Sequence, residues 1–293
     1  MRNRATLTAA LLAACSAACM ATSATAAPVI GAFADPAGPG SATEQAVTAF
    51  ETSLGQTLTV DNTYSGFNWS GALTREKWDL VGGRMPMKSW TAGLYGVSCV
   101  LLTDVTAGKY DTQLKAQAAL VKALPGEIWL RLFYEMNDSK AEKCANPTQS
   151  GPVFIAAWQH VVGLFIAAGA TNAIWVWAPG QPAYAENKEL DFYPGSGWVN
   201  VVGEDVYNKT ANAEPFPAAG GACTVGPSLG KPYAITETGA IGVTNQLAWL
   251  ANINTLCPGL SAFIYWDSDG DAGNYNITDP TAFAALHAIG QTH

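Results

Sequence analysis

The chain has 293 residues, a formal net charge of −8, and only 13% charged residues. This length suits one large domain, and the acidic balance argues against binding to nucleic acid or to anionic membranes. The expected binding partner is therefore a neutral or at least non-anionic molecule.

The N-terminal 26 residues have the form of a secretory signal peptide. Arg2 and Arg4 give a basic start, residues 7–18 are apolar, and residues 24–26 offer a small-residue cleavage site. The apolar run is too short to span a bilayer, so no membrane span is expected. We predict a signal peptide over residues 1–26 and a secreted protein, extracellular or periplasmic. The alternative is lipid anchoring at Cys15, which ends a lipoprotein-like box.

Four cysteines remain after the signal peptide, which is an even number in an oxidising compartment: Cys99, Cys144, Cys223 and Cys257. Two disulfides are therefore expected, and three pairings are possible. We favour Cys99–Cys144 and Cys223–Cys257, because each joins neighbouring segments. The spacing of these cysteines does not match that of a zinc site, and no metal site is predicted.

In chain order, short apolar runs alternate with longer amphipathic ones. The first half predicts strands over residues 29–34, 58–64 and 84–90, and helices over 43–54 and 112–123. The second half predicts five more strands and three more helices. The strands are 127–134, 173–178, 198–207, 233–236 and 261–266, and the helices are 153–168, 244–256 and 280–289.

This count of eight strands with intervening helices predicts an α/β fold, a (β/α)₈ TIM barrel over residues 27–293 as a single domain. No repeat or linker divides that region. An open doubly wound sheet is the alternative, but the glycine-rich phosphate turn typical of it does not follow the first predicted strand.

Two glutamates stand where predicted strands end. Glu135 closes the fourth strand and Glu237 the seventh. In such a barrel, chemistry is located at the carboxyl ends of the strands. Side-chain alternation places Glu135 on the same face as Arg131 and Phe133, and Glu237 on the same face as Ile235. If those faces point inward, both carboxyls meet at the barrel mouth.

Two carboxyls at one mouth suit the cleavage of a glycosidic bond. One protonates the leaving oxygen while the other, ionised, attacks the anomeric carbon. The structural alternative is that each glutamate only forms a buried salt bridge, for example Glu135 with Arg131. The ten tryptophans and ten tyrosines are consistent with sugar binding, because aromatic rings suit the apolar faces of sugars, although core packing explains part of them.

The motifs around these glutamates resemble glycoside hydrolase family 26. The resemblance rests on several motifs in the family's order, from residue 29 to the C-terminus and strongest over residues 125–270. They are residues 131–137 (RLFYEMN), 154–162, 169–179, 192–195 with 199–208, 231–239 (KPYAITETG) and 262–267.

The resemblance implies a retaining endo-β-glycanase, most simply an endo-β-1,4-mannanase, with neither a cofactor nor a metal in its chemistry. Glu135 is then the acid/base and Glu237 the nucleophile. Tyr207 is expected to hydrogen-bond Glu237, and Trp266 to form an aromatic floor beneath the sugar. Further substrate-binding residues are expected to be Tyr134, Asn137, Trp177 and Asp205, although Trp177 and Asp205 fit the barrel core equally well.

One position departs from the family pattern. Mannanases of the family usually carry histidine before the acid/base glutamate, and here that residue is Tyr134. This leaves β-1,3-1,4-glucan and β-1,3-xylan as alternative substrates, and a non-catalytic carbohydrate-binding barrel as an alternative function. The expected partner is a neutral polysaccharide, and the protein is expected to be a monomer.

Overall fold

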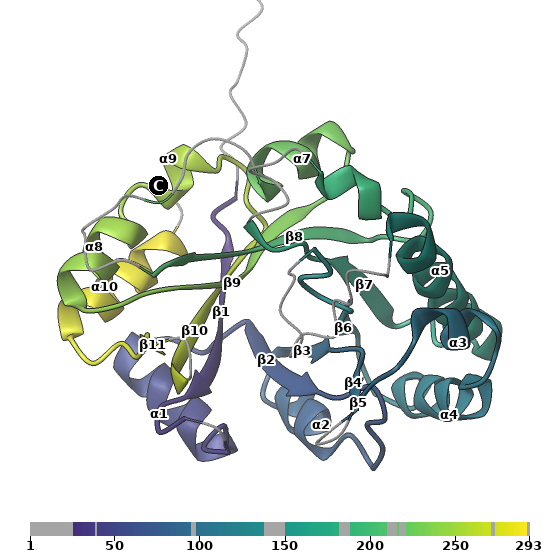
Figure 1. Cartoon of the computed structure of the whole chain (residues 1–293). Helices are drawn as coiled ribbons and strands as arrows, with labels where there is room; N and C mark the ends of the chain where they lie inside the picture. The colour runs from purple at the N-terminus through teal and green to yellow at the C-terminus, as the bar shows by residue number, and fades with distance from the viewer. Residues whose placement is uncertain are drawn as a thin grey trace, which may run out of the picture.

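Eight parallel β-strands form a closed barrel with the helices around its outside (Figure 1). The strand order is β1-β2-β3-β6-β7-β8-β9-β10, and β10 pairs with β1 to close the ring. This computed structural model describes residues 26–38, 40–94, 98–137, 150–181, 188–209, 216, 221–270 and 273–291. The predicted (β/α)₈ barrel is confirmed.

Each predicted strand corresponds to one barrel strand. The barrel strands are β1 (Val29–Asp35), β2 (Val60–Ser65), β3 (Met85–Trp90), β6 (Ile128–Leu132), β7 (Ala173–Trp177), β8 (Val201–Asn208), β9 (Tyr233–Ala240) and β10 (Ala262–Gly270). Two short antiparallel strand pairs lie beside the barrel. One is β4 (Gly93–Leu94) with β5 (Ser98–Cys99), and the other is β11 (Gly273–Asn274) with the end of β10. The largest differences from prediction are at β9 and β10, which run four residues further than predicted.

Helices cover the outside of the barrel. They are α1 (Glu44–Leu54), α2 (Thr74–Val81), α3 (Leu102–Thr106), α4 (Asp111–Lys122), α5 (Gly151–Ala168), η2 (Glu189–Phe192), α7 (Ala222–Ser228), α8 (Val243–Leu250), α9 (Ile253–Leu256) and α10 (Pro280–Ile289). The helix predicted over residues 244–256 is wrong as one element. It divides into α8 and α9, because Ala251 is extended and Asn252 adopts a left-handed conformation with φ 64°.

Two apolar layers hold the barrel together. The interior contains a small cluster, formed by Val60, Met87, Val176, Val201, Ala234, Ala262 and Ile264. A much larger cluster contains side chains from both the strands and the surrounding helices, including Trp90, Trp158 and Phe165. The two clusters thus pack on the two faces of the barrel strands.

The predicted disulfide between Cys223 and Cys257 is confirmed, with an S–S distance of 2.00 Å. It links the start of α7 to the residue after α9. Cys99 is also disulfide-bonded, but its predicted partner Cys144 lies outside the described residues.

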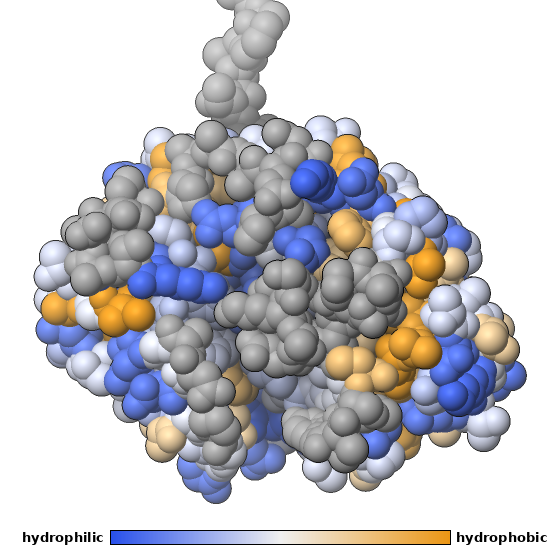
Figure 2. Space-filling view, in the orientation of Figure 1, coloured by the Kyte–Doolittle hydropathy of each residue, from blue (hydrophilic) through white to orange (hydrophobic). Residues whose placement is uncertain are grey.

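Helix α5 is long and apolar enough to cross a membrane, as judged by length and composition alone. In this structure it packs on the barrel, with Trp158, Val161 and Phe165 buried. On the face shown in Figure 2, hydrophobic residues gather beside α3 and α5. Ile166 of α5 is 59% exposed. The burial of Trp158, Val161 and Phe165 fits a helix that packs on the outside of the barrel strands.

Candidate active site

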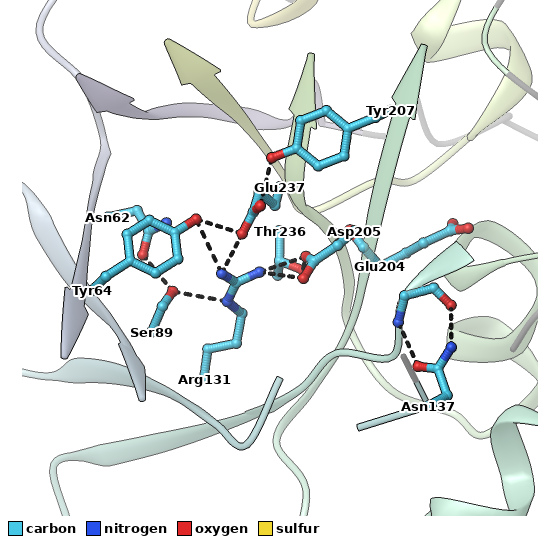
Figure 3. A network of polar contacts seen from close by, with 11 residues as sticks. Asn62, Tyr64, Ser89, Arg131, Asn137, Glu204, Asp205, Tyr207, Thr236 and Glu237 are labelled. Atoms are coloured by element: carbon cyan, nitrogen blue, oxygen red, sulfur yellow. Dashed lines mark hydrogen bonds and ion pairs between the residues drawn. The ribbon is translucent and has the colours of Figure 1, made fainter. Parts of the chain in front are cut away.

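A buried arginine organises the mouth of the barrel (Figure 3). Arg131 comes from β6 and is fully buried. Its Nη1 contacts both carboxylate oxygens of Asp205 at 2.5 and 2.6 Å, and its Nη2 contacts Oε2 of Glu237 at 2.5 Å. Its Nε donates to Ser89 Oγ at 2.8 Å. A buried guanidinium requires this pairing, since an unpaired charge in the interior is very costly.

Glu237 accepts hydrogen bonds at both of its carboxylate oxygens. Tyr207 donates to Oε1 at 2.5 Å, and Tyr64 donates to Oε2, which also faces Arg131. Burial, and then the charge of Glu237, raise the pKa values of both Tyr64 and Tyr207 well above the usual range. Both phenols therefore remain protonated donors at neutral pH. Donors at both oxygens stabilise the ionised carboxylate.

Asp205 lies beneath this carboxylate and not in a cleft. It is 2% exposed, and its Oδ1 also accepts from Thr236 Oγ1 at 2.7 Å. Burial raises its pKa, an effect that the charge of Arg131 opposes. The side chain of Asp205 is enclosed by Arg131 and Thr236, which fits the barrel-core alternative that the sequence left open. It anchors the arginine that faces Glu237.

An irregularity in β9 brings Glu237 into the mouth. The pairing with β8 shifts between Glu204↔Ile235 and Asp205↔Glu237, so that Thr236 is an extra residue in the ladder. Ile235 belongs to the outer cluster, whereas Ala234 belongs to the interior one. The predicted alternation is therefore wrong for β9: Ile235 faces outward, and the bulge turns Glu237 inward.

Glu135 stands on a turn that follows β6. Phe133 and Glu135 have positive φ values of 46° and 51°, which is a costly conformation for residues other than glycine. Backbone hydrogen bonds hold the turn, from Phe133 N to Trp90 O at 2.7 Å and from Glu135 N to Ala178 O at 2.8 Å. Phe133 packs on the helix side against Phe154. Alternation therefore fails here too.

Glu135 nevertheless lies in the same electrostatic environment as Glu237 of β9. It is 9% exposed, and the charges of both Glu237 and Glu135 help to raise the pKa of Asp205. The ion pairs of Arg131 are with Asp205 and Glu237. The structure thus brings the two predicted catalytic glutamates to one end of the barrel.

Two residues next to Glu135 support this arrangement. The guanidinium of Arg131 lies over the ring of Tyr134, with its Cζ 4.3 Å from the ring centroid. The same ring contacts Tyr64 edge-on. Asn137 donates to Gly180 O at 3.2 Å and accepts from Gly180 N at 2.8 Å, which ties the turn to the segment after β7. Tyr134 and Asn137 are both partly exposed.

The expected aromatic floor and the expected cleft residue have different outcomes. Trp266 is half-buried at the mouth, stacked on Phe33 and edge-on to Tyr207. Trp177 is completely buried; its indole donates to Phe192 O at 3.1 Å, and its ring packs on Tyr193. The side chain of Trp177 lies in the larger apolar cluster, which fits the core alternative that the sequence left open.

Sequence reasoning did not identify Tyr64 and Arg131 as site residues. Both were detectable: Tyr64 stands near the end of β2, and Arg131 is a charged residue inside an otherwise apolar strand. A buried charge of that kind must have a partner, and the nearest carboxylates lie on other barrel strands. Among the described residues, no three His, Cys, Asp or Glu side chains gather as a metal site requires.

Comparison with known proteins gives matches in sequence. The model of Glycosyl hydrolase family 26 matches residues 152–225. Endoglucanase H of Acetivibrio thermocellus is 28% identical over 171 residues, which are 56% of this chain and 18% of that protein. The mannan endo-1,4-beta-mannosidase of Bacillus subtilis is 32% identical over 102 residues, which are 34% of this chain and 26% of that protein. The chain thus covers about a quarter or less of either relative's length.

Solved structures match over nearly the whole chain. A GH26 β-mannanase from Bacteroides ovatus has a TM-score of 0.67 at 15% identity, covering 91% of this chain and 89% of that one. The Bacillus subtilis mannanase BCman has a TM-score of 0.67 at 16% identity, covering 89% and 84%. At these identities the likeness shows the fold. The sequence match over residues 152–225 is to the same family, so the chain is similar to glycosyl hydrolase family 26 in part of its sequence and in its fold.

Proposed function

We propose that this protein is a retaining endo-β-glycanase in which Glu237 is the nucleophile and Glu135 the acid/base. The observation that carries the proposal is the environment of Glu237 at the barrel mouth, where Tyr64, Tyr207 and Arg131 all donate to its carboxylate. These donors favour the ionised form, which is the form that attacks carbon.

In the first step, Glu135 donates its proton to the glycosidic oxygen while a Glu237 oxygen attacks the anomeric carbon. The bond to the leaving sugar breaks, and a covalent glycosyl–enzyme ester forms. Glu135 is 9% exposed, and its charge helps to raise the pKa of the neighbouring Asp205. A general acid requires a protonated carboxyl, which is the role proposed for Glu135.

In the second step, Glu135 takes a proton from water, and the water oxygen attacks the anomeric carbon of the ester. Glu237 leaves as a carboxylate, to which the same donors again provide stabilisation. Two inversions at one carbon give net retention. Trp266 offers its half-buried ring as a platform for the sugar at the cleavage point.

β-1,4-Mannan is the proposed substrate. The proposal draws on the Bacillus subtilis relative, which is named a mannan endo-1,4-beta-mannosidase. A β-1,3-1,4-glucan is the second candidate. It is favoured by Tyr134 in place of the family's usual histidine and by the match to a protein named Endoglucanase H.

The proposed location is outside the cell, with residues 1–26 removed as a signal peptide and residues 27–293 forming the catalytic domain as a monomer. Mass spectrometry of the protein recovered from culture medium tests the cleavage site. A lipid-modified Cys15 at the new N-terminus would contradict this proposal and favour the anchored alternative.

Replacing the two glutamates separately tests the mechanism. Glu237→Ala should lower kcat on the order of 10⁴-fold or more, and Glu135→Ala by about 10²–10⁴-fold. On an activated aryl β-glycoside with azide, Glu237→Ala should form the α-glycosyl azide and Glu135→Ala the β-glycosyl azide. Glu127→Ala, which changes an exposed glutamate before β6, is the matched control. Wild-type activity in Glu237→Ala would contradict the assignment.

A further inference from the structure

Trp266 lies in a socket whose walls come from separate parts of the chain. Phe33 at the end of β1 stacks on its ring at a centroid distance of 6.2 Å. Tyr207 and Tyr275 meet the ring edge-on at 6.0 and 5.5 Å. Since Tyr207 also donates to Glu237, the tryptophan and the proposed nucleophile share one neighbour. The position of the ring is therefore linked to the position of Glu237.

The β10–β11 hairpin closes this socket on the remaining side. Gly270, which pairs with Gly273, lies against the end of the indole: a methyl group at Gly270 would be 2.7 Å from Cη2 of Trp266. Gly270 is not among the glycines with positive φ, so its backbone conformation accepts alanine. Among the described residues, Trp266 is the one that a methyl group at Gly270 would meet at less than 3 Å.

Tyr275 forms the rear wall and is fixed to the barrel. It is completely buried, and its ring lies directly on β9, where a methyl group at Gly239 would be 2.8 Å from Cδ1. Its backbone N donates to Ser268 O at 3.0 Å, and its carbonyl accepts from Tyr265 OH at 2.9 Å. The ring also packs on Tyr207 at 5.0 Å. Tyr275 thus supports both Tyr207 and Trp266, the two aromatic residues of the proposed active site.

We propose that Gly270 and Tyr275 are positioning residues that set the place of the Trp266 ring relative to Glu237, and through it the fit of the sugar at the cleavage point. This inference rests on the proposed hydrolase function. Neither residue needs to touch the substrate. Gly270 limits how far the indole extends toward the hairpin, and Tyr275 supports the indole and Tyr207 from the barrel side.

A double-mutant cycle tests the role of Gly270. Gly270→Ala should lower kcat/KM on soluble β-mannan, or on lichenan if that is the substrate, by about tenfold, with little change in Tm. In a Trp266→Ala background the same change should cost nothing further, because the displaced ring is absent. Gly197→Ala is the control, since that exposed glycine has no positive φ and open space around it. Losses that add in the double variant would overturn the inference.

The role of Tyr275 is tested by a pair of variants. Tyr275→Phe keeps the ring and should retain most of kcat/KM, whereas Tyr275→Leu removes the ring and should lose about tenfold or more. The loss in Tyr275→Leu should include a raised KM, since the sugar platform itself is displaced. Equal losses in both variants would contradict a role for the ring.

A crystal structure of Gly270→Ala separates this inference from the proposed function. The Trp266 ring should move away from the hairpin and off its stack on Phe33. A ring in its original place, with the hairpin displaced instead, would overturn the inference whatever the enzyme's activity. Absence of hydrolysis by the wild-type protein on every polysaccharide would contradict the proposed function alone.

Discussion

The barrel contains two clusters in which an arginine meets two aspartate or glutamate side chains, and they differ in what surrounds them. The mouth cluster is Arg131 with Asp205 and Glu237. The α2 cluster lies on the helix side of β2, where Arg75 pairs with Asp61 at 2.6 Å and approaches Asp79 at 3.7 Å.

Hydroxyl donors and access distinguish the two clusters. In the mouth cluster, tyrosine hydroxyls complete the shell of Glu237, which is 6% exposed at the barrel mouth. In the α2 cluster, Asp61 and Asp79 are fully enclosed. Burial, and then the neighbouring Asp61, raise the pKa of Asp79 to about 9. A buried arginine with two carboxyls is therefore not sufficient evidence of a catalytic site: in one cluster a carboxyl at the mouth accepts from two tyrosine hydroxyls, and the other cluster joins a helix to the sheet.

Replacing the arginine of each cluster should give the largest difference between the mouth cluster and the α2 cluster. Arg131→Met leaves two buried carboxyls without their cation, so it should lower the free energy of unfolding by about 3–5 kcal/mol and abolish hydrolysis. Arg75→Met, which changes a partly exposed residue, should destabilise less and leave activity per folded molecule unchanged. Urea unfolding and kcat measured on folded protein check both.

A milder variant at the same position keeps the test valid if Arg131→Met does not fold. Arg131→Lys keeps the charge but not the planar fork that reaches both carboxyls, so the folded protein should have a strongly reduced kcat. Unchanged kcat in Arg131→Lys, or a lost kcat in folded Arg75→Met, would contradict the distinction between the clusters.

Removing a single hydroxyl from the mouth cluster should have the next largest effect. Tyr64→Phe and Tyr207→Phe each remove one donor to a charged carboxylate, which should reduce kcat/KM by about 10- to 100-fold. The acidic limb of the pH–rate profile should also move to higher pH, because the ionised form has lost a donor. Tyr233→Phe is the control, since that hydroxyl donates to Pro258 O away from the mouth. If the acidic limb of the pH–rate profile stays at the same pH, Tyr64 and Tyr207 have a packing role only.

The two glutamates were predictable from sequence because each follows an apolar strand, and parallel strands end at one rim of the barrel. The way in which they reach the mouth was not predictable. The extra residue at Thr236 and the positive φ of Glu135 are set by pairing with neighbouring strands. Strict alternation of side chains predicted the correct end of the barrel for both glutamates. The features that place them there are the bulge in β9 and the turn after β6.

The α2 cluster shows the opposite failure. The segment containing α2 is polar and interrupted by glycines, and it carries no strong helical period, so no helix was predicted there. The helix forms because it docks onto charged partners, including Lys88 with Glu76 at 2.5 Å. Likewise, Trp177 and Asp205 fitted cleft and core equally well, and only the structure shows both to be enclosed.

The pH dependence of stability should reveal the α2 cluster. The pKa of Asp79 is about 9 in the folded state, against 3.8 for its ordinary value. Between these values the folded protein holds a proton that the unfolded chain releases, so stability falls as pH rises from about 4 to 9. Asp79→Asn removes this loss and should show a smaller decrease in Tm between pH 5 and pH 9. The exposed Asp191→Asn serves as control, and identical slopes in all three proteins would refute the assignment.

The smallest expected effect concerns Trp78 in α2, which could be a distal sugar platform or a packing residue. Its ring lies between two guanidinium groups, 5.0 Å from that of Arg75 and 4.3 Å from that of Arg84. Such contacts favour stability by about 0.5–1 kcal/mol each at partly exposed sites, so Trp78→Ala should lower the free energy of unfolding by about 1–2 kcal/mol. KM for long and short oligosaccharides should stay equal to that of the wild type. A KM that rises only for long substrates would instead extend the sugar-binding surface to the α2 cluster, and would remove the distinction between an active mouth and a purely structural flank.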